Sequence, residues 1–182
     1  MWAKIENNEI TETFKHPKGI TIGDTQYPHN IFSLWSEAEL NAIGIYSITT
    51  DITNLKDPEY YQNTDITYTY ASNTVTGDYG EATAKTLADL KKNKKGNINS
   101  TADALLSEYD WYTLRAASGG TAIPSVVTTY QAAVRTKSNT MCTAIDDASD
   151  VDALAALYVY NSDDPPVRPL GEWPNKPEIK KN

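Results

Sequence analysis

The side chains of this chain that are best suited to catalysis or metal binding are carboxylates in one polar stretch. Residues 51–65 contain Asp51, Asp57, Glu59 and Asp65. A pair of carboxylates can hydrolyse a glycosidic bond, but only in a rigid cleft that moves their pKa values apart, and the sequence gives no sign of such a cleft. The stretch also lacks the alternating D-x-D-x-D-G pattern of a calcium loop. We therefore expect no catalytic residue and no metal site, in a protein that is not an enzyme.

The other reactive side chains are few. His16 and His29 lie beside prolines, with no cysteine or carboxylate at metal-ligand spacing, so we expect them to have a surface or hydrogen-bonded role and not to form a ligand pair. The single cysteine, Cys142, excludes an intrachain disulfide and a cysteine-based zinc cluster. The sequence has no glycine-rich phosphate loop and no G-x-S-x-G elbow. We therefore expect no cofactor.

Charge and composition favour contacts with other proteins. A net charge of −8 and a pI near 4.7 argue against nucleic acid or an anionic membrane as a partner, because both attract basic patches. The chain has 12 tyrosines against 2 phenylalanines, and tyrosine is typical of half-exposed strands and partly wet contact surfaces. The aromatic residues that we expect to divide between core and interface are Tyr68, Tyr70, Trp111, Tyr112 and Trp173.

The elements that must position these side chains are organised around residues 31–46. Ser36 is a good helix N-cap, and Glu39 completes a capping box. Trp35 and Leu40 have the spacing of a hydrophobic staple, and Gly44 can take the left-handed conformation that ends a helix. A helix this short does not hold itself in water. We therefore predict one short helix whose Trp35 and Leu40 are buried within the protein itself.

Residues 1–80 are predicted to form a small β-rich docking module with roughly six strands around that helix. Strict alternation places Ile66, Tyr68 and Tyr70 on one face of a strand. The predicted strands lie in a hairpin over residues 2–14 that turns at Asn7-Asn8, and at residues 20–22, 45–50, 65–71 and 74–76.

Residues 81–160 are predicted to form about four helices, from their apolar spacing. Gly96-Asn97 is expected to stop the first helix and Ser100 to cap the second, which would leave residues 93–100 as an exposed linker. The four lysines between residues 91 and 95 are then predicted to lie in water at the C-terminal end of the first helix. The alternative is that they form a binding patch. Pro124 begins another helix, whose extent beyond Asn139 the sequence leaves open.

From residue 161 to residue 182 the chain is predicted to be an extended tail, because five prolines forbid regular structure. Trp173 is expected to anchor this tail on another surface. The fold class is thus α+β. No signal-peptide core follows Met1 and no apolar run reaches the length of a membrane span. We expect a soluble protein that is made in the cytoplasm and not secreted.

Two stretches together resemble proteins of tailed bacteriophages. The first resembles a small N-terminal module of virion, tail-fibre and tail-fibre-assembly proteins; its matching residues are Ile22-Gly23-Asp24, Gln26-Tyr27-Pro28, Leu34-Trp35-Ser36, Gly44-Ile45 and Asp57-Pro58-Glu59-Tyr60-Tyr61. The second resembles the helical phage tail assembly chaperone domain; its matching residues are Leu105-Leu106, Asp110-Trp111, Arg115, Gly120, Ile123-Pro124, Tyr130, Arg135 and Trp173-Pro174. The chain departs from that second pattern at Gln131, where the family usually has arginine, and in a longer stretch over residues 140–162.

The resemblance implies a structural, non-enzymatic component of the virion, in the tail or fibre apparatus. Such a protein would act by assembly with other phage structural proteins and with copies of itself as a homo-oligomer, after synthesis in the host cytoplasm. One alternative is a tail-fibre assembly chaperone that leaves before the particle matures. A second alternative is a host-glycan recognition module that uses the acidic, tyrosine-rich residues 51–80.

Overall fold

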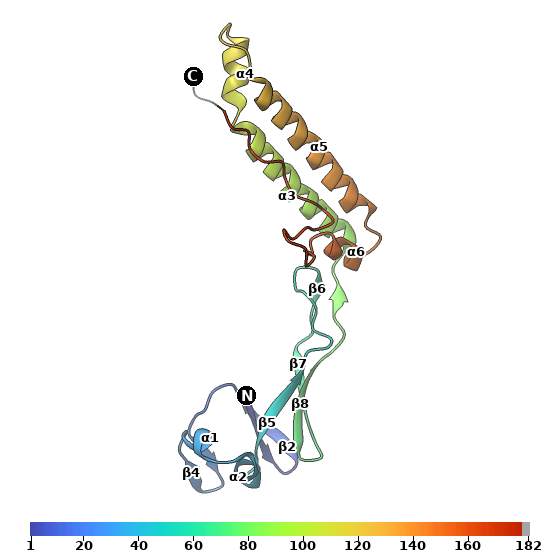
Figure 1. Cartoon of the computed structure of the whole chain (residues 1–182). Helices are drawn as coiled ribbons and strands as arrows, with labels where there is room; N and C mark the ends of the chain where they lie inside the picture. Colours follow the sequence, from blue (N-terminus) through green and yellow to red (C-terminus); the bar gives the residue numbers. More distant parts are fainter. Residues whose placement is uncertain (180–182) are drawn as a thin grey trace. The chain divides into compact units, whose positions relative to one another are not determined.

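The computed structural model describes residues 1–179 and has an α+β architecture, as predicted. The chain divides into two compact units, Met1–Thr83 and Ala84–Asn182. The first unit carries nearly all of the strands and the second carries the long helices (Figure 1). Each unit has a hydrophobic cluster of its own.

A five-stranded sheet with the order β2-β1-β5-β8-β7 forms the frame of the first unit. Its strands are β1 (Trp2–Glu6), β2 (Glu9–Phe14), β5 (Ile45–Asp51), β7 (Ile66–Ala71) and β8 (Thr74–Tyr79). The pair β5–β8 is parallel and the other neighbouring pairs are antiparallel. The sheet curls, because β2 and β7, at opposite ends of this order, come into contact.

Two asparagine-containing turns fix the hairpins of this sheet, and the one at Asn7-Asn8 is the predicted turn. Asn7 and Asn8 have φ angles of 52° and 65°, and Ser72 and Asn73 have φ angles of 51° and 58°. Two consecutive positive φ angles are the requirement of the tight hairpin turn that matches the twist of the strands. The half-buried residues of β7 alternate with exposed ones, which confirms that Ile66, Tyr68 and Tyr70 share a face.

The shorter strands of the chain fall where sequence periodicity is weakest. The hairpin of β3 (Ile20–Ile22) and β4 (Thr25–Tyr27) forms one small sheet, and β6 (Tyr61–Gln62) and β9 (Thr83–Ala84) form another. The prediction of roughly six strands missed β4, β6 and β9. Strands of two or three residues are too short to show alternation.

Two short helices, rather than the predicted one, pack against the sheet. They are α1 (Ile31–Leu34) and α2 (Glu37–Ala42). Asn30 occupies the N-cap position of α1 without a capping hydrogen bond from its side chain, and the helix is held instead by burial of Ile31. In a helix this short, tertiary packing outweighs local propensity.

The capping signals of α2 are confirmed. Glu39 accepts a hydrogen bond from the Ser36 backbone N–H at 2.7 Å, and the Ser36 side chain accepts one from the Glu39 N–H. The Ser36 backbone and hydroxyl donors lower the pKa of the Glu39 carboxyl. Gly44 ends the helix with φ of 83°, and its N–H donates to the Asn41 carbonyl at 3.0 Å.

The hydrophobic core of the first unit lies between these helices and the sheet. Leu40 is buried as predicted, and Trp35 is half-buried with its ring centroid 5.7 Å from that of Tyr27. Burial is therefore confirmed for Leu40, whereas Trp35 is covered only in part. The buried members of the cluster are Phe14, Ile20, Ile31, Leu40 and Ile45.

The second unit is a helical hairpin with two short helices at its ends (Figure 1). Over residues 84–179 its helices are α3 (Leu87–Ser107), α4 (Asp110–Ala117), α5 (Ser125–Asp147) and α6 (Val151–Ala156). Their number matches the prediction of about four, but the boundary between the first two is at Tyr109 and not at the predicted position. The helices α3 and α5 are antiparallel, since Lys95 near the start of α3 pairs with Asp146 at the end of α5. Asp150 caps α6 by accepting the Ala153 N–H at 2.7 Å.

The predicted break at Gly96-Asn97 is wrong, because α3 runs through it without interruption. The buried residues of α3 recur every fourth position, as Leu90, Lys94, Ile98 and Ala102. This packing against α5 outweighs the cost of about 1 kcal/mol for an exposed helical glycine. Consequently residues 93–100 are not a linker and Ser100 is not a cap. The helix α5 likewise continues through Asn139 to Asp147.

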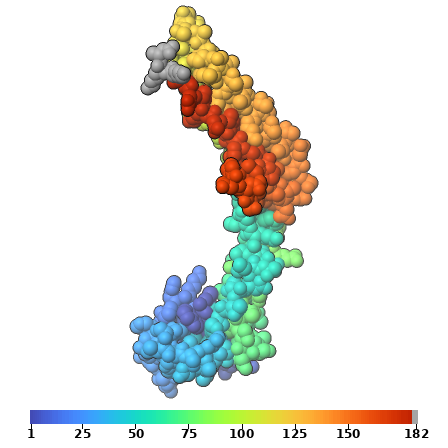
Figure 2. All heavy atoms as spheres, viewed as in Figure 1, coloured from blue at the N-terminus to red at the C-terminus, as the bar shows by residue number. Residues whose placement is uncertain are grey.

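The tail returns along the helices without forming a helix or strand of its own over residues 161–179. Figure 2 shows this tail, in dark red, lying on the helical unit. Leu170 is only 3% exposed, and its N–H donates to the Leu157 carbonyl at 3.0 Å. Trp173 packs against the helical core, which confirms its role as an anchor. Among residues 1–179, no helix is both long enough and apolar enough to span a bilayer.

Candidate interaction surface

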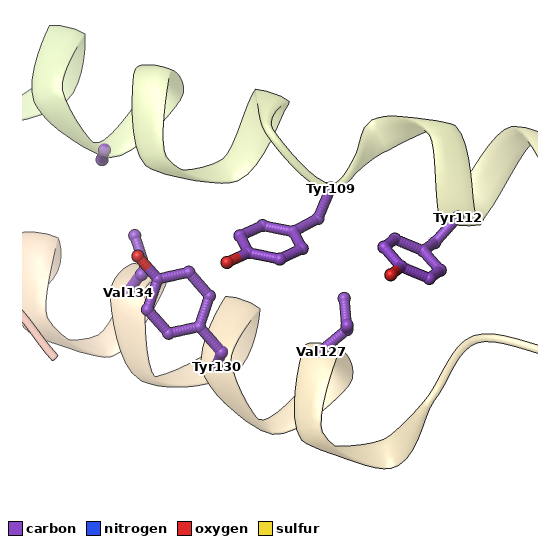
Figure 3. Close-up of a cluster of buried hydrophobic side chains, with 6 residues drawn as sticks. Tyr109, Tyr112, Val127, Tyr130 and Val134 are labelled. Atoms are coloured by element: carbon purple, nitrogen blue, oxygen red, sulfur yellow. The ribbon is translucent and has the colours of Figure 1, made fainter. Parts of the chain in front are cut away.

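Three tyrosines gather in the core of the helical unit (Figure 3). Tyr109 lies at the break between α3 and α4, where its ring centroid is 5.3 Å from that of Tyr130 and 6.3 Å from that of Tyr112. The cluster also contains Val127 and Val134 from α5. Tyr112, one of the predicted interaction residues, is 8% exposed and therefore belongs to this core in the free chain.

The hydroxyl of Tyr130 is buried in that cluster without a hydrogen-bond partner. Burial raises the pKa of Tyr130, because the phenolate would lose its hydration. The hydroxyl therefore stays neutral at physiological pH. In the close-up it points into the interior between the two long helices (Figure 3).

Trp111, the neighbour of Tyr112 in the sequence, faces solvent, although its ring centroid lies only 4.0 Å from that of Tyr112. It is 49% exposed, and Leu114, one turn later, is 68% exposed. The guanidinium carbon of Arg115 lies 4.6 Å from the Trp111 ring centroid and 5.2 Å from that of Tyr112. We call Trp111, Leu114 and Arg115 the α4 patch. It presents an indole, an isobutyl group and a stacked cation on one short helix.

The α4 patch has the composition of a contact surface. Tryptophan and arginine are the residues most enriched at the energetic centres of protein interfaces. Stacking on the two rings holds the Arg115 guanidinium in place before any partner arrives. Sequence reasoning identified Trp111 but missed Leu114, although the spacing of three residues on a helix is the signal that joins them.

The sheet tyrosines form a second group in the first unit. The hydroxyl of Tyr70 lies 3.2 Å from that of Tyr46 and 3.0 Å from the Asn73 side-chain oxygen. The hydrogen bond from Tyr70, followed by burial, raises the pKa of Tyr46. Tyr68 covers Gly77 of β8, since a Cβ there would come within 2.9 Å of its ring. Both predicted interaction residues of β7, Tyr68 and Tyr70, are half-buried.

A small polar pocket adjoins Tyr70. It has a volume of about 200 Å³ and is lined by Asn8, Tyr70, Ala71, Ser72 and Asn73. The tips of the two tight turns therefore meet here. Amide groups beside a tyrosine ring supply hydrogen bonds and one flat apolar face.

Trp173 anchors the tail beside the tyrosine cluster. Three residues later, the Lys176 ammonium pairs with the Glu108 carboxylate at 2.6 Å. The hydrogen bond to Glu108 raises the pKa of Lys176. A groove of about 330 Å³ remains open between the tail and the start of α5. Its lining residues are Ser125, Val126, Thr129, Tyr130, Ala133, Pro174, Asn175 and Pro177.

The carboxylates of residues 51–65 serve local turns. Asp51 accepts the Thr53 hydroxyl at 2.6 Å and the Thr53 N–H at 2.8 Å, and these donors lower the pKa of Asp51. Asp57 accepts the Glu59 N–H at 2.8 Å. His16 and His29 are exposed, as expected. Within residues 1–179 there is no group of three or more histidine, cysteine or acidic side chains that could hold a metal ion.

The lysines of residues 91–95 do not form the solvated helix end that the sequence suggested, because α3 continues past them. Lys91 donates to the Asp146 carbonyl at 2.9 Å, and Lys95 pairs with the Asp146 carboxylate at 2.7 Å. Lys94 is 8% exposed, with its ammonium 4.1 Å from the Tyr158 ring centroid. These lysines therefore connect α3 to α5 and to the segment after α6.

Comparison of the chain with models of known protein families, with curated proteins and with solved structures finds no match in any of the three.

Proposed function

We propose that this protein is a structural, non-enzymatic component of a bacteriophage particle, in its tail or fibre apparatus, and that it works by protein–protein assembly. The phage setting comes from the sequence motifs that resemble virion proteins and tail assembly chaperones. In this setting the protein resides in the virion, contacts other phage structural proteins and forms symmetric homo-oligomers.

The observation that carries the assembly role is the α4 patch. A tryptophan that is 49% exposed next to a leucine that is 68% exposed leaves apolar surface in water. Burying such a surface against a neighbouring subunit is favourable in proportion to the apolar area removed from water. The Arg115 guanidinium, already stacked on Trp111, adds a cation that can pair with an acidic group on that neighbour.

Mass spectrometry of purified particles tests this proposal. Particles of the phage that encodes the chain are banded by density and washed, and an abundant non-structural phage protein serves as the contamination control. The proposal expects peptides of this chain to be enriched over that control. Absence from the particles, together with a fibre protein that folds only when this chain is co-expressed, would replace the proposal with the assembly-chaperone role.

The pocket beside Tyr70 favours one second candidate, recognition of a host glycan. Proteins commonly bind sugars with a flat aromatic face flanked by amide groups, and Asn8, Tyr70 and Asn73 bring these together. A glycan array that is positive for the protein and loses its signal on Tyr70→Ala would support this role. A blank array for the unaltered chain would remove it.

A further inference from the structure

The end of the tail has the features of a docked peptide. Residues 172–179 make no backbone–backbone hydrogen bond with any part of the chain that the structure describes. Side chains hold the segment instead: Trp173 and Ile179 pack on the tyrosine cluster, and Lys176 pairs with Glu108. The segment begins just after Gly171, whose φ of 73° provides a sharp change of direction.

The sequence of this segment matches a known mode of peptide recognition. Pro174-Asn175-Lys176-Pro177 has the P-x-x-P spacing of a proline-rich ligand, and Trp173 precedes it directly. Such segments dock in aromatic-lined grooves at low entropic cost, because proline already holds the extended conformation. The receiving surface here contains Tyr109, Tyr112 and Tyr130, with Glu108 at its edge to receive the lysine.

The contacts that hold residues 172–179 on the helical unit leave this segment easy to displace. The groove of about 330 Å³ between the two prolines and α5 stays open beside the docked segment. The Lys176–Glu108 pair is also exposed, with side-chain exposures of 56% and 46%, so it contributes little to holding the tail down. Displacing residues 172–179 thus breaks side-chain contacts alone, and a second tail can re-form each of them.

We propose that the surface under residues 172–179, formed by the tyrosine cluster and Glu108, is a receptor for Trp-Pro-x-Lys-Pro segments, and that in the assembled state it takes residues 172–179 of a second copy of the chain. Two copies that exchange tails reciprocally keep every contact of the free chain and gain a connection between subunits. Such exchange is a low-cost route to a symmetric dimer. The tethered tail has an effective concentration of order millimolar, so exchange is favoured where copies are concentrated, as in a growing particle.

The inference rests on the proposed function, because it names the partner of the homo-oligomer as a second copy. The two can fail separately. A chain that is present in particles but never exchanges its tail loses only this inference. A chain that exchanges its tail in solution but is absent from particles loses only the phage role.

Cross-linking between full-length chains tests the exchange. In a Cys142→Ser background, a Glu108→Cys chain is mixed with a Lys176→Cys chain at roughly millimolar concentration and treated with a short bismaleimide. The matched control mixes the Lys176→Cys chain with an Asp103→Cys chain, whose thiol is exposed on a different side of α3. Both tested positions are exposed, so the variants keep the fold.

Tail exchange predicts that the Glu108→Cys and Lys176→Cys chains form a covalent heterodimer roughly tenfold faster than the control pair, because the docked tail raises the local thiol concentration. The same rate for both pairs would overturn the inference. A single chain that carries both Glu108→Cys and Lys176→Cys would in that case cross-link only within itself. Docking would then be confined to the chain's own tail.

Discussion

Replacing Gly44 by alanine tests how the first unit is held together. Gly44 has φ of 83°, and its carbonyl accepts the Ile5 N–H at 2.8 Å. A Cβ at this position would lie 2.7 Å from the Ile5 carbonyl oxygen, which belongs to the backbone of β1. The glycine therefore fixes both the end of α2 and the approach of β1.

Two costs add in the Gly44→Ala variant. An L-residue in the left-handed conformation costs about 1–2 kcal/mol. Relieving the contact with the Ile5 oxygen requires a backbone shift that weakens a hydrogen bond worth about 1 kcal/mol. We therefore expect a loss of about 2–3 kcal/mol in the free energy of unfolding of the first unit. Gly23→Ala is the matched control, since Gly23 has φ of 58° but a methyl group added there would meet nothing within 4 Å.

Urea titration with hydrogen-exchange mass spectrometry measures both variants, because peptides from β1 and β5 report on the first unit alone. The control is expected to lose only the backbone-strain part, about 1–2 kcal/mol, and so about 1 kcal/mol less than Gly44→Ala. The entropy that alanine removes from the unfolded chain is the same in both variants and cancels in the comparison. Equal losses for Gly44→Ala and Gly23→Ala would refute the claim that close approach to β1 matters.

Three further predictions concern single side chains. Gly96→Ala is expected to stabilise the helical unit by about 0.5–1 kcal/mol in urea unfolding followed by circular dichroism, because the site is an exposed helix interior; a loss would contradict a continuous α3. Ile145→Ala is expected to cost about 2–5 kcal/mol, whereas Val126→Ala, at a half-exposed site, stays within about 0.5 kcal/mol in the same assay. Glu39→Gln is expected to reduce the pH dependence of stability. The pKa of Glu39 is lower in the folded state than in the unfolded state, so its contribution to stability is present above the unfolded-state pKa and disappears as pH falls through the folded-state pKa. Unfolding midpoints of the unaltered chain, measured from roughly pH 6 down to pH 3, should therefore converge with those of the variant. Parallel curves for the two proteins would contradict this prediction.

Local signals are sufficient wherever the structure is held by neighbours in the sequence. The Ser36–Glu39 capping box and the Asn7-Asn8 turn involve groups only a few residues apart, and both are present as predicted. The parallel pairing of β5 with β8 has no such signal. It joins strands separated by a long connection, and its register, Ile48 opposite Val75, is set by packing that sequence periodicity does not encode.

The helical unit shows where local signals mislead. Gly96 predicts a stop because glycine commonly ends helices, yet it lies on the exposed side of α3, where it only weakens the helix. Lys94 is of a residue type that usually lies at the surface, but it is buried here, and its ammonium group lies over the Tyr158 ring. Once Lys94 is included, the spacing from Leu90 to Ile98 forms one uninterrupted stripe.

The candidate site is predictable in kind but not in detail. Aromatic residues are expected to divide between core and surface, and the adjacent Trp111 and Tyr112 do so. Their assignment depends on the rotation of α4 against α5, which no pattern in eight residues of helix determines. The docking of Trp173 on the tyrosine cluster likewise depends on the path of a tail that has no periodicity.

Incorporation of altered chains into particles tests the assembly role most directly. Trp111→Ala and the control Thr113→Ala, an exposed residue of the same helix outside the α4 patch, are each supplied in place of the unaltered chain, and copies per purified particle are counted by quantitative mass spectrometry. Because a central interface tryptophan costs about 2 kcal/mol or more when truncated, we predict at least a roughly tenfold loss of Trp111→Ala copies and normal incorporation of Thr113→Ala. Equal incorporation of the two variants, or no copies of the unaltered chain in the particle, would contradict the account.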